Sequence, residues 1–588
     1  MSRGKVNVFI ALLAACLCCV FDLSAQKQAP PPRPSQASDT SRYVEIINAN
    51  TYRFLTIDSV KQIQVMTGNV QLLQGNTRFR ADSVVFNERE NFVEAFGNIH
   101  IKDADSVNIY SQYLMYEGTK KLATFKRNVK LSDGNSILYT DHMEYDLNGK
   151  VGTYRDGGRL ESKQTTLTSK QGFYYADIKD VYFYEKVKLA DPEYALATDT
   201  LLYNTGNRVA TFLAPTTIKT GNSIVYTKEG FYDLQKKQSR LGKRSVVQDS
   251  SSVMIADDFA FDDNKGMGEA RGNVWYKDSV QKMQLYANTL YFHKKKKSFL
   301  ATDKPVLVLV QETDSIYIAA DTLFSGMFQE LKTLRRKGFV SAFDTSKAAF
   351  QEADSSVVIN RSDLLSISNP LKNKPEKTSL SKDTIQIDSI ASSTKNTISV
   401  DTIRFITGFR NVRIYNDSLQ AVADSMFYSG IDSSFALYYE PTVWNKDNQI
   451  TGDTILLFTK NKKADKMDVF ENAMMIQQLN SECYNQLRGR FLKAIFKDGE
   501  ISFTEVKGNS ESIYFARDSD SAFIGMTRTE ADKIDMMFKN KQLQQVKYIR
   551  SIKSTTYPMR SIPEGKAKLE GFEWRNEKRP KDKFSLFQ

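Results

Sequence analysis

Short segments in which apolar and polar residues alternate recur along most of the chain, at a spacing near 29 residues. The first half of each unit has the form of Ala81–Phe86, Thr140–Tyr145 and Thr198–Tyr203. The second half has the form of Ala95–Ile101 and Ala270–Tyr276. Alternation with a period of two, in segments rich in Val, Ile, Tyr, Phe and Thr, indicates β-strands and not helices. Self-similarity this regular predicts a stack of repeats.

An anchor position near the start of each first half gives the period. It falls at residues 82, 112, 141, 170, 199, 228 and 257. Turn-forming residues at 87–91, 204–207 and 262–266 join the halves, so each repeat is expected to be two strands connected by a turn. One unit cannot bury its apolar face alone, so successive units must stack. The sequence therefore predicts an elongated all-β solenoid or folded-over sheet.

Side chains two positions apart on a strand share a face, and one face of these repeats is consistently apolar. We predict that it forms either a sealed sandwich core or an open groove for acyl chains, whose burial is worth about 0.8 kcal/mol per methylene. At about 4.8 Å per strand, eight or nine repeats predict an apolar strip on the order of 40 Å long. The candidate lipid-binding residues are Val84, Phe86, Ile99, Ile101, Leu114, Tyr116, Val129, Leu131, Met143, Tyr145, Leu201, Tyr203, Leu290 and Phe292.

The N-terminus resembles a secretory signal. Arg3 and Lys5 precede an apolar run, and small residues end it at Ala25, where we expect cleavage. An alternative cleavage box would leave Cys16 as a lipidated anchor. The expected boundaries are 1–25 for the signal peptide, 26–42 for a Pro-rich linker, 43–325 for a first repeat block, 326–402 for a low-complexity insert, 403–540 for a second repeat block and 541–588 for a basic irregular tail.

The formal net charge of +12 indicates that this chain, if exported, is attracted to anionic molecules or surfaces. Such a protein meets little nucleic acid, so phosphorylated lipids, acidic glycans or a membrane surface are its expected anionic neighbours. A run of four lysines, Lys294–Lys297, is expected at a solvated hairpin tip. Four Cys and three scattered His exclude a disulfide scaffold and a Cys-based zinc site, and no cofactor is expected.

The recurring aspartates come mostly singly, one per repeat, at strand entries, so they do not form the cluster that calcium requires. They are Asp82, Asp141, Asp199, Asp257, Asp321, Asp424 and Asp453. We expect them to make hydrogen bonds at strand edges or turns. The pairs Gly97-Asn98, Gly272-Asn273 and Gly508-Asn509 are expected to be bends or bulges. Neither His142 nor His100 has an evident nucleophile beside it, so catalysis is not expected.

The anchor motif, as in Ala81-Asp82-Ser83, and the Gly-Asn-Val motif, as in Gly272-Asn273-Val274, resemble those of OstA/LptA-type lipopolysaccharide-transport proteins. The likeness is closest to the larger OstA-like proteins of Bacteroidetes-type bacteria, over roughly 45–325 and 403–538. The resemblance implies a β-jellyroll, V-shaped in section, that holds the acyl chains of lipid A. It also implies a periplasmic bridge to the outer membrane, built by end-to-end β-strand pairing with other transport components or by self-association.

Two other classes of function stay open from the residues alone. One is an exported structural or adhesive β-solenoid that binds glycans on its outer face. The other, placed last, is a glycan-processing β-helix enzyme. Lipid binding in the interior predicts dependence on inward-facing apolar residues, whereas adhesion predicts dependence on outer-face aromatic residues.

Overall fold

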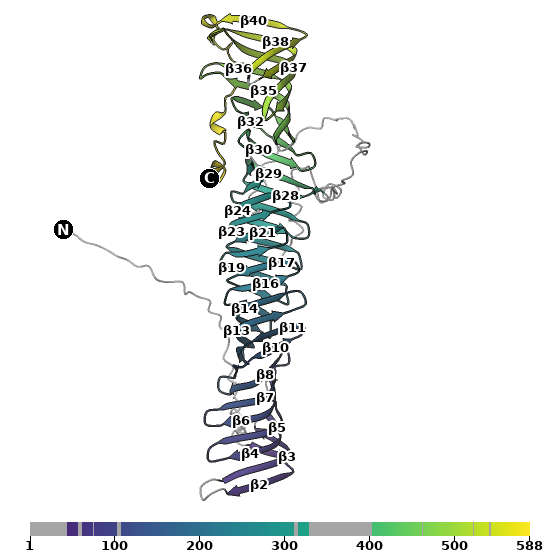
Figure 1. The fold of residues 1–588 in the computed structure, drawn as a ribbon, viewed down its shortest axis with the longest axis vertical. Coiled ribbons are helices and arrows are strands. Elements are labelled where there is room, and N and C mark those ends of the chain that lie inside the picture. Colours follow the sequence, from purple (N-terminus) through teal and green to yellow (C-terminus); the bar gives the residue numbers. More distant parts are fainter. Residues whose placement is uncertain are drawn as a thin grey trace, which may run out of the picture.

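A computed structural model describes residues 44–56, 62–74, 76–102, 107–310, 315–328, 403–460, 463–520, 522–539 and 542–587. These residues form one elongated column of antiparallel strands stacked in chain order (Figure 1). The all-β, two-stranded repeat fold predicted from the sequence is therefore confirmed. The predicted signal peptide, the Pro-rich linker, the Cys16 anchor and nearly all of the low-complexity insert lie outside the described residues.

The sheet folds over along a line of corners that divides it into two halves. In β5 (Phe92–Lys102) the backbone at Gly97 and Asn98 has positive φ angles of 72° and 43°, and the register with β4 (Thr77–Asn87) shifts at this point. A bulge of this kind bends a strand and allows it to continue in a second plane. We call the half that contains Ile99–Lys102 half-sheet A, and the half that contains Phe92–Phe96 half-sheet B.

Sixteen strands cross the corner without a break and belong to both halves. They are β3 (Gln62–Gln74), β4, β5, β6 (Asn108–Glu117), β7 (Leu122–Ser132), β8 (Ile137–Asp146), β13 (Asp180–Ala190), β14 (Ala195–Asn204), β23 (Met267–Asp278), β24 (Met283–His293), β29 (Arg404–Tyr415), β30 (Gln420–Ser429), β35 (Lys463–Gln478), β36 (Tyr484–Lys497), β37 (Glu500–Arg517) and β38 (Phe523–Lys539).

Elsewhere the corner interrupts the strand and each half has its own element. Half-sheet A then contains β1 (Val44–Asn48), β10 (Gly158–Ser162), β11 (Thr165–Ser169), β16 (Thr216–Thr220), β17 (Ser223–Thr227), β20 (Ser245–Gln248), β21 (Ser252–Ala256), β26 (Val306–Leu309), β27 (Ile316–Ala319), β32 (Thr442–Asn445), β33 (Asn448–Thr451) and β40 (Lys553–Pro558). Half-sheet B contains β2 (Thr51–Thr56), β9 (Val151–Tyr154), β12 (Gln171–Tyr175), β15 (Val209–Phe212), β18 (Glu229–Asp233), β19 (Gln238–Gly242), β22 (Asp258–Asp262), β25 (Ser298–Thr302), β28 (Thr322–Met327), β31 (Ser434–Tyr438), β34 (Thr454–Lys460) and β39 (Gln542–Ile549).

The recurring aspartates stabilise the corners. Asn98 donates a side-chain hydrogen bond of 2.9 Å to Asp82 on the neighbouring strand. The same arrangement joins Asn273 to Asp257, Asn411 to Asp321 and Asn472 to Asp453. All four asparagines have positive φ, which this residue type tolerates better than most. The prediction of Asp hydrogen bonding is thus confirmed for Asp82, Asp257, Asp321 and Asp453. The predicted bends are confirmed at all three Gly-Asn pairs, where the strand register shifts. Lys294–Lys297 forms the turn between β24 and β25.

The boundary of the second repeat block is later than the sequence suggested. We predicted an irregular tail from residue 541, but β39 and β40 extend the sheet to Pro558. The strand β40 was missed because Lys553–Pro558 carries no apolar alternation. In β39, Val546 and Tyr548 do alternate with polar residues, and this short signal was overlooked. After Pro558 the chain contains the 3-10 helices η3 (Met559–Ser561), η4 (Asn576–Lys578) and η5 (Phe584–Phe587).

This C-terminal segment, residues 559–587, runs back along the outer face of half-sheet A, as the position of the C-terminus in Figure 1 shows. The buried Gln486 accepts from the Leu569 amide and donates to the Ala567 carbonyl. Further along, Gln449 bonds backbone groups of Glu573 and Arg575 in the same way. Paired side-chain bonds to backbone fix an extended segment without requiring a strand. We call residues 559–587 the strap.

Candidate functional site

The interior of half-sheet A contains an unbroken row of directly paired residues, one per strand, which we call ladder A. Its first 25 members are apolar: Ile46, Leu72, Phe79, Ile101, Ile109, Leu131, Leu138, Leu160, Leu167, Leu189, Leu196, Ile218, Val225, Val247, Met254, Tyr276, Leu285, Leu307, Ile318, Ile414, Ala421, Val443, Ile450, Met475 and Leu487. The last three are Ser512, Thr529 and Ser554.

Ladder A is much longer than the strip expected from the sequence. Neighbouring strands are spaced by about 4.8 Å, so its 25 apolar members extend over roughly 115 Å. The expected length of about 40 Å was wrong because it counted one strand for each repeat. Each repeat places two strands in each half-sheet, and the row continues through the second repeat block.

Half-sheet B contributes an opposing row in which aromatic and small residues alternate, which we call ladder B. Its aromatic members are Phe86, Tyr116, Tyr145, Tyr174, Tyr203, Tyr232, Phe261 and Phe292. The residues between them are Val93, Ala123, Gly152, Val181, Ala210, Ser239 and Gly268. Small neighbours leave room for the rings: a Cβ on Gly268 would lie 2.3 Å from Cζ of Phe292.

The structure brings all 14 candidate residues to the interior. Five belong to ladder B, and Ile101 and Leu131 belong to ladder A. The other seven lie between the ladders and the corner and are at most 3% exposed: Val84, Ile99, Leu114, Val129, Met143, Leu201 and Leu290. Their role as lipid contacts stays a prediction.

Sequence reasoning missed three aromatic members of ladder B: Tyr174, Tyr232 and Phe261. Each follows an anchor position by four residues, as Tyr145 and Tyr203 do. Counting four residues on from the anchor positions 170, 228 and 257 is sufficient to find them. The signal was weaker at Tyr174 and Tyr232, because their anchor positions are Lys170 and Lys228 and not aspartate. Phe261 lies in the full motif Ala256–Phe261 and was left out of the candidates although the motif was recognised.

The interior opens to solvent at the N-terminal end of the column. Ile46 of ladder A is 41% exposed, and Tyr52 and Phe54, which continue half-sheet B, are 44% and 66% exposed. Further in, Val70 and Met66 are almost fully buried. Ladder A therefore begins at an apolar mouth, which consists of Val44, Ile46, Tyr52 and Phe54.

Opposite the corner, the hairpin turns of the two half-sheets face one another along a seam. In the described part of the seam, backbone strand pairing occurs within each half-sheet and does not connect the two. Side-chain contacts therefore hold the seam together. Asp133 in half-sheet A accepts hydrogen bonds from Thr205 at 2.7 Å and from Tyr174 at 3.0 Å, both in half-sheet B. Arg208 donates to Thr165 at 3.1 Å, and Lys237 forms an ion pair with Glu193. We call these contacts the seam latch.

Burial and charge act together on the phenols at the seam. Burial, and secondly the Asp133 carboxylate, raise the pKa of Tyr174 above its ordinary value. Burial and then Asp263 raise the pKa of Tyr232, whose ring lies 4.8 Å from that of Tyr194 across the seam. Both phenols stay protonated at neutral pH, so Tyr174 remains a hydrogen-bond donor to Asp133.

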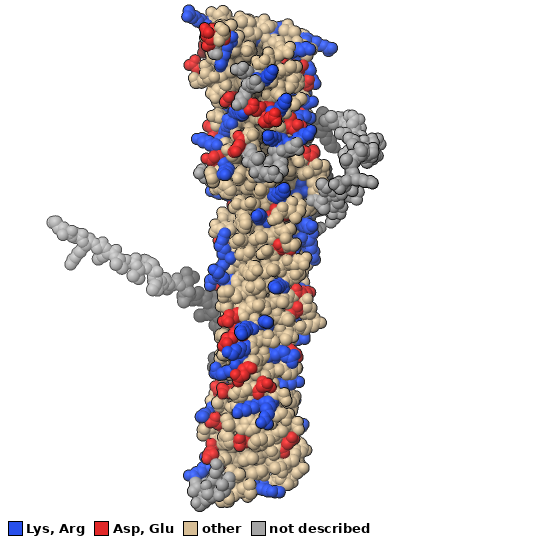
Figure 2. All heavy atoms as spheres, viewed as in Figure 1, with Lys and Arg blue, Asp and Glu red and all other residues tan. Residues whose placement is uncertain are grey.

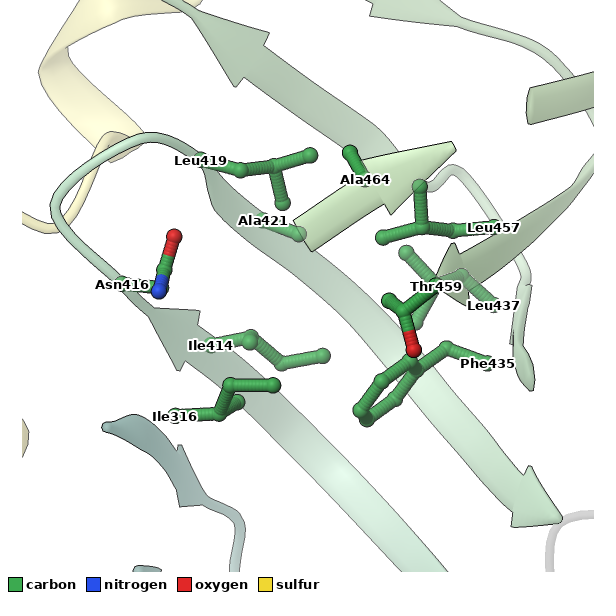
Figure 3. Close-up of a pocket in the computed structure, with 10 residues that line it drawn as sticks. All are labelled: Ile316, Ile414, Asn416, Leu419, Ala421, Phe435, Leu437, Leu457, Thr459 and Ala464. Carbon is green, nitrogen blue, oxygen red and sulfur yellow. The ribbon is translucent and has the colours of Figure 1, made fainter. Parts of the chain in front are cut away.

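A cavity of about 30 Å³ lies between the half-sheets, lined by Ile316, which precedes the insert in sequence, and by residues that follow it. Figure 3 shows Ile316, Ile414 and Leu419 of half-sheet A opposite Phe435 and Leu457 of half-sheet B. Asn416 and Thr459 also line it, and the rest of the lining is apolar. This volume holds no more than a water molecule or two. At this site a hydrocarbon chain therefore requires the half-sheets to move apart.

Within the described residues, no three His, Cys, Asp or Glu side chains gather as metal ligands would. None of the described helices has the length and hydropathy of a membrane span. On the face shown in Figure 2, basic and acidic side chains are interspersed along the column. The features of this chain that point to a ligand are therefore its apolar interior, its mouth and its seam.

Three comparisons relate the chain to known proteins. The family model described as OstA-like protein matches residues 41–199, which confirms the resemblance over this segment. No curated protein matches the chain. A similar solved structure is LptH, described as the LptA-homologous periplasmic component of the conserved lipopolysaccharide transport device from Pseudomonas aeruginosa. The two are 15% identical over 18% of this chain and 84% of LptH, with a TM-score of 0.17.

Proposed function

We propose that this chain, whose residues 41–199 are an OstA-like segment, is a non-catalytic periplasmic bridge that carries the acyl chains of lipopolysaccharide toward the outer membrane. The observation that carries this proposal is ladder A, an apolar row of 25 paired residues that begins at an exposed mouth. Each methylene moved from water to such a surface gains about 0.8 kcal/mol. Twelve methylenes would gain roughly 10 kcal/mol, against the cost of separating the half-sheets.

Uptake follows from the way the column is held together. Backbone hydrogen bonds run along each half-sheet, whereas side-chain contacts such as those of Asp133 close the seam. A hydrogen bond contributes about 1 kcal/mol. Two neighbouring strands of a half-sheet share several of them, whereas the described seam contacts are few, so opening the seam breaks fewer hydrogen bonds than separating two strands. An acyl chain entering at the mouth or the seam then replaces contacts between ladders A and B with contacts to itself.

The N-terminal end of the column offers edges for end-to-end pairing. Among the residues that the structure describes, strands β1 and β2 pair with β3 alone, each along one edge, and every residue of β2 is exposed. Unpaired edges of this kind accept a further strand from another protein. We propose that another lipopolysaccharide-transport component adds its strand here. A photo-crosslinker at Leu55 is then expected to capture that component, and capture of a second copy of this chain would indicate self-association instead.

Photo-crosslinking to purified lipopolysaccharide tests the lipid role. A benzophenone amino acid replaces Tyr116, which belongs to ladder B and faces the interior, or Met115, which faces outward on the same strand. We expect labelling of lipopolysaccharide from position 116 and little from position 115. Equal labelling from the two positions, or none from either, would refute lipid carriage in the interior.

An adhesive function on the outer face stays the alternative, and two exposed outer aromatics favour it. Phe96 is 41% exposed and stacks edge-on against Tyr113, and Tyr110 is 38% exposed. Exposed aromatic rings supply apolar contact area for a ligand. Glycan binding that Phe96→Ala and Tyr110→Ala abolish, with no labelling from position 116, would support adhesion over transport.

A further inference from the structure

Ladder A changes chemistry at its C-terminal end. After Leu487, the same row of directly paired positions continues as Ser512, Thr529 and Ser554. Ser512 is fully buried and Thr529 is 1% exposed, so these hydroxyls lie inside the column. Thr529 pairs with Ser554 at 2.9 Å. The apolar row therefore ends three strands before the sheet does.

One of these hydroxyls is bonded across the interior. Ser512 Oγ in half-sheet A lies 3.1 Å from Oη of Tyr548 in half-sheet B. An alkyl chain passing this point must separate the two groups, and it offers neither of them a new partner. Leaving buried polar groups unpaired costs free energy. An alkyl chain that moves past apolar members of ladder A, such as Met475 and Leu487, leaves no polar group unpaired.

Over the same strands, the outer face of half-sheet A becomes apolar. Ile513 and Phe515 alternate with Ser512 and face outward, and Met526 lies opposite Phe515. They form a cluster with Leu569 of the strap. In these strands the inward side is thus polar and the outward side is apolar, the reverse of the strands before them. The strap covers the apolar outward side.

We propose that the acyl path is open at the N-terminal mouth and closed to hydrocarbon beyond Leu487, a proposal that rests on the lipid-carrying function. An alkyl chain held by ladder A then enters or leaves by the mouth or through the seam, and does not pass out of the C-terminal end. The Ser512–Tyr548 pair, which spans the interior, sets this limit. The Thr529–Ser554 pair lies beyond it, within half-sheet A, and its Ser554 is exposed.

The full mature chain, incubated with a 16-carbon fatty acid carrying a terminal diazirine, tests the proposal. After irradiation, labelled peptides are mapped by mass spectrometry. We expect label on half-sheet A peptides up to Leu487 and at least a tenfold lower yield on β37, β38 and β40. The variant Thr529→Val/Ser554→Val/Ser512→Ala/Tyr548→Phe removes both partners of each pair, which limits the cost to stability. In this variant we expect the label to extend into β37 and β38.

The control is Thr555→Val, which makes a similar change on the outward side of β40, where Thr555 lies opposite Arg528. It should leave the label where it is in the wild type. Equal yields before and after Leu487 in the wild type would overturn the closed end. So would a quadruple variant that folds, as shown by its circular dichroism, and does not extend the label. Absence of label everywhere would instead refute lipid carriage itself.

Discussion

The side-chain amide of Asn273 donates a hydrogen bond of 2.7 Å to the Asp257 carboxylate, and this bond secures the corner between β22 and β23. Asn273 has a φ of 45°. Arg244 also donates to Asp257, at 3.1 Å. The bonds from Asn273 and then Arg244 lower the pKa of Asp257 below its ordinary value. The corner is thus stabilised by a carboxylate that must be charged.

The first prediction concerns pH. Because the pKa of Asp257 is lower in the folded chain, the unfolded chain binds more protons, and the stabilisation is present above about pH 4 and lost as the pH falls through the folded value. We expect Asp257→Asn to reduce stability by about 1 kcal/mol or less at pH 6, since the group is partly exposed. Melting curves at pH 3 to 6 should show the difference from wild type shrinking toward pH 3. A difference that does not vary with pH would contradict this.

The second prediction concerns the packing of ladder B. Gly268 lies under the ring of Phe292, so Gly268→Val should overpack this site and destabilise the chain by about 1–3 kcal/mol. Phe292→Ala leaves space for the added methyl groups and should recover part of the loss in the double variant. Urea unfolding of the two single variants and the double variant measures the coupling. Additive losses would show that the ring and the glycine do not share this space.

The third prediction concerns the seam latch. Asp133→Ala removes the acceptor of both Thr205 and Tyr174, so the seam should open more often and take up a fluorescent fatty acid several-fold faster. A matched control is Asp156→Ala, whose side chain is 75% exposed and lies outside the latch. Stopped-flow uptake measures both rates.

The reverse experiment closes the seam. Asp133→Cys/Thr205→Cys, made with Cys483→Ala and joined by a short bismaleimide, should slow uptake, whereas the unjoined double cysteine variant should not. Uptake that is unaffected by the crosslink would mean that lipid does not enter through this part of the seam.

The fourth prediction concerns the strap. Ending the chain after Pro558 should expose Ile513, Phe515 and Met526, which now pack against Leu569. We expect strong binding of a hydrophobic dye and self-association in sedimentation. The control Lys581→Ala keeps the strap and removes one charge. A truncated chain that stays monomeric and binds no dye would show that the strap is not needed to cover this face.

Much of the repeat could be predicted from the sequence because it depends on local chemistry. Alternation as in Leu201 and Tyr203 fixes which side chains share a face, and glycine or asparagine at Gly97-Asn98 marks the corner. The later strands were harder: β40 has no apolar alternation, and the change at Ser512 is visible only after its partner Leu487 is known.

The sequence alone determined the strands of the repeats, their 29-residue period and the residues of one apolar face, because each follows from neighbours a few positions apart, whereas it did not predict β39 and β40. Only the tertiary structure decided that Asp133 meets Thr205, 72 positions away, and that the strap returns over strands whose faces have exchanged polarity. Which residues meet in these contacts depends on the position of one half-sheet relative to the other. The twist of many successive strands sets that position. The twist accumulates along the column, so no single repeat encodes it.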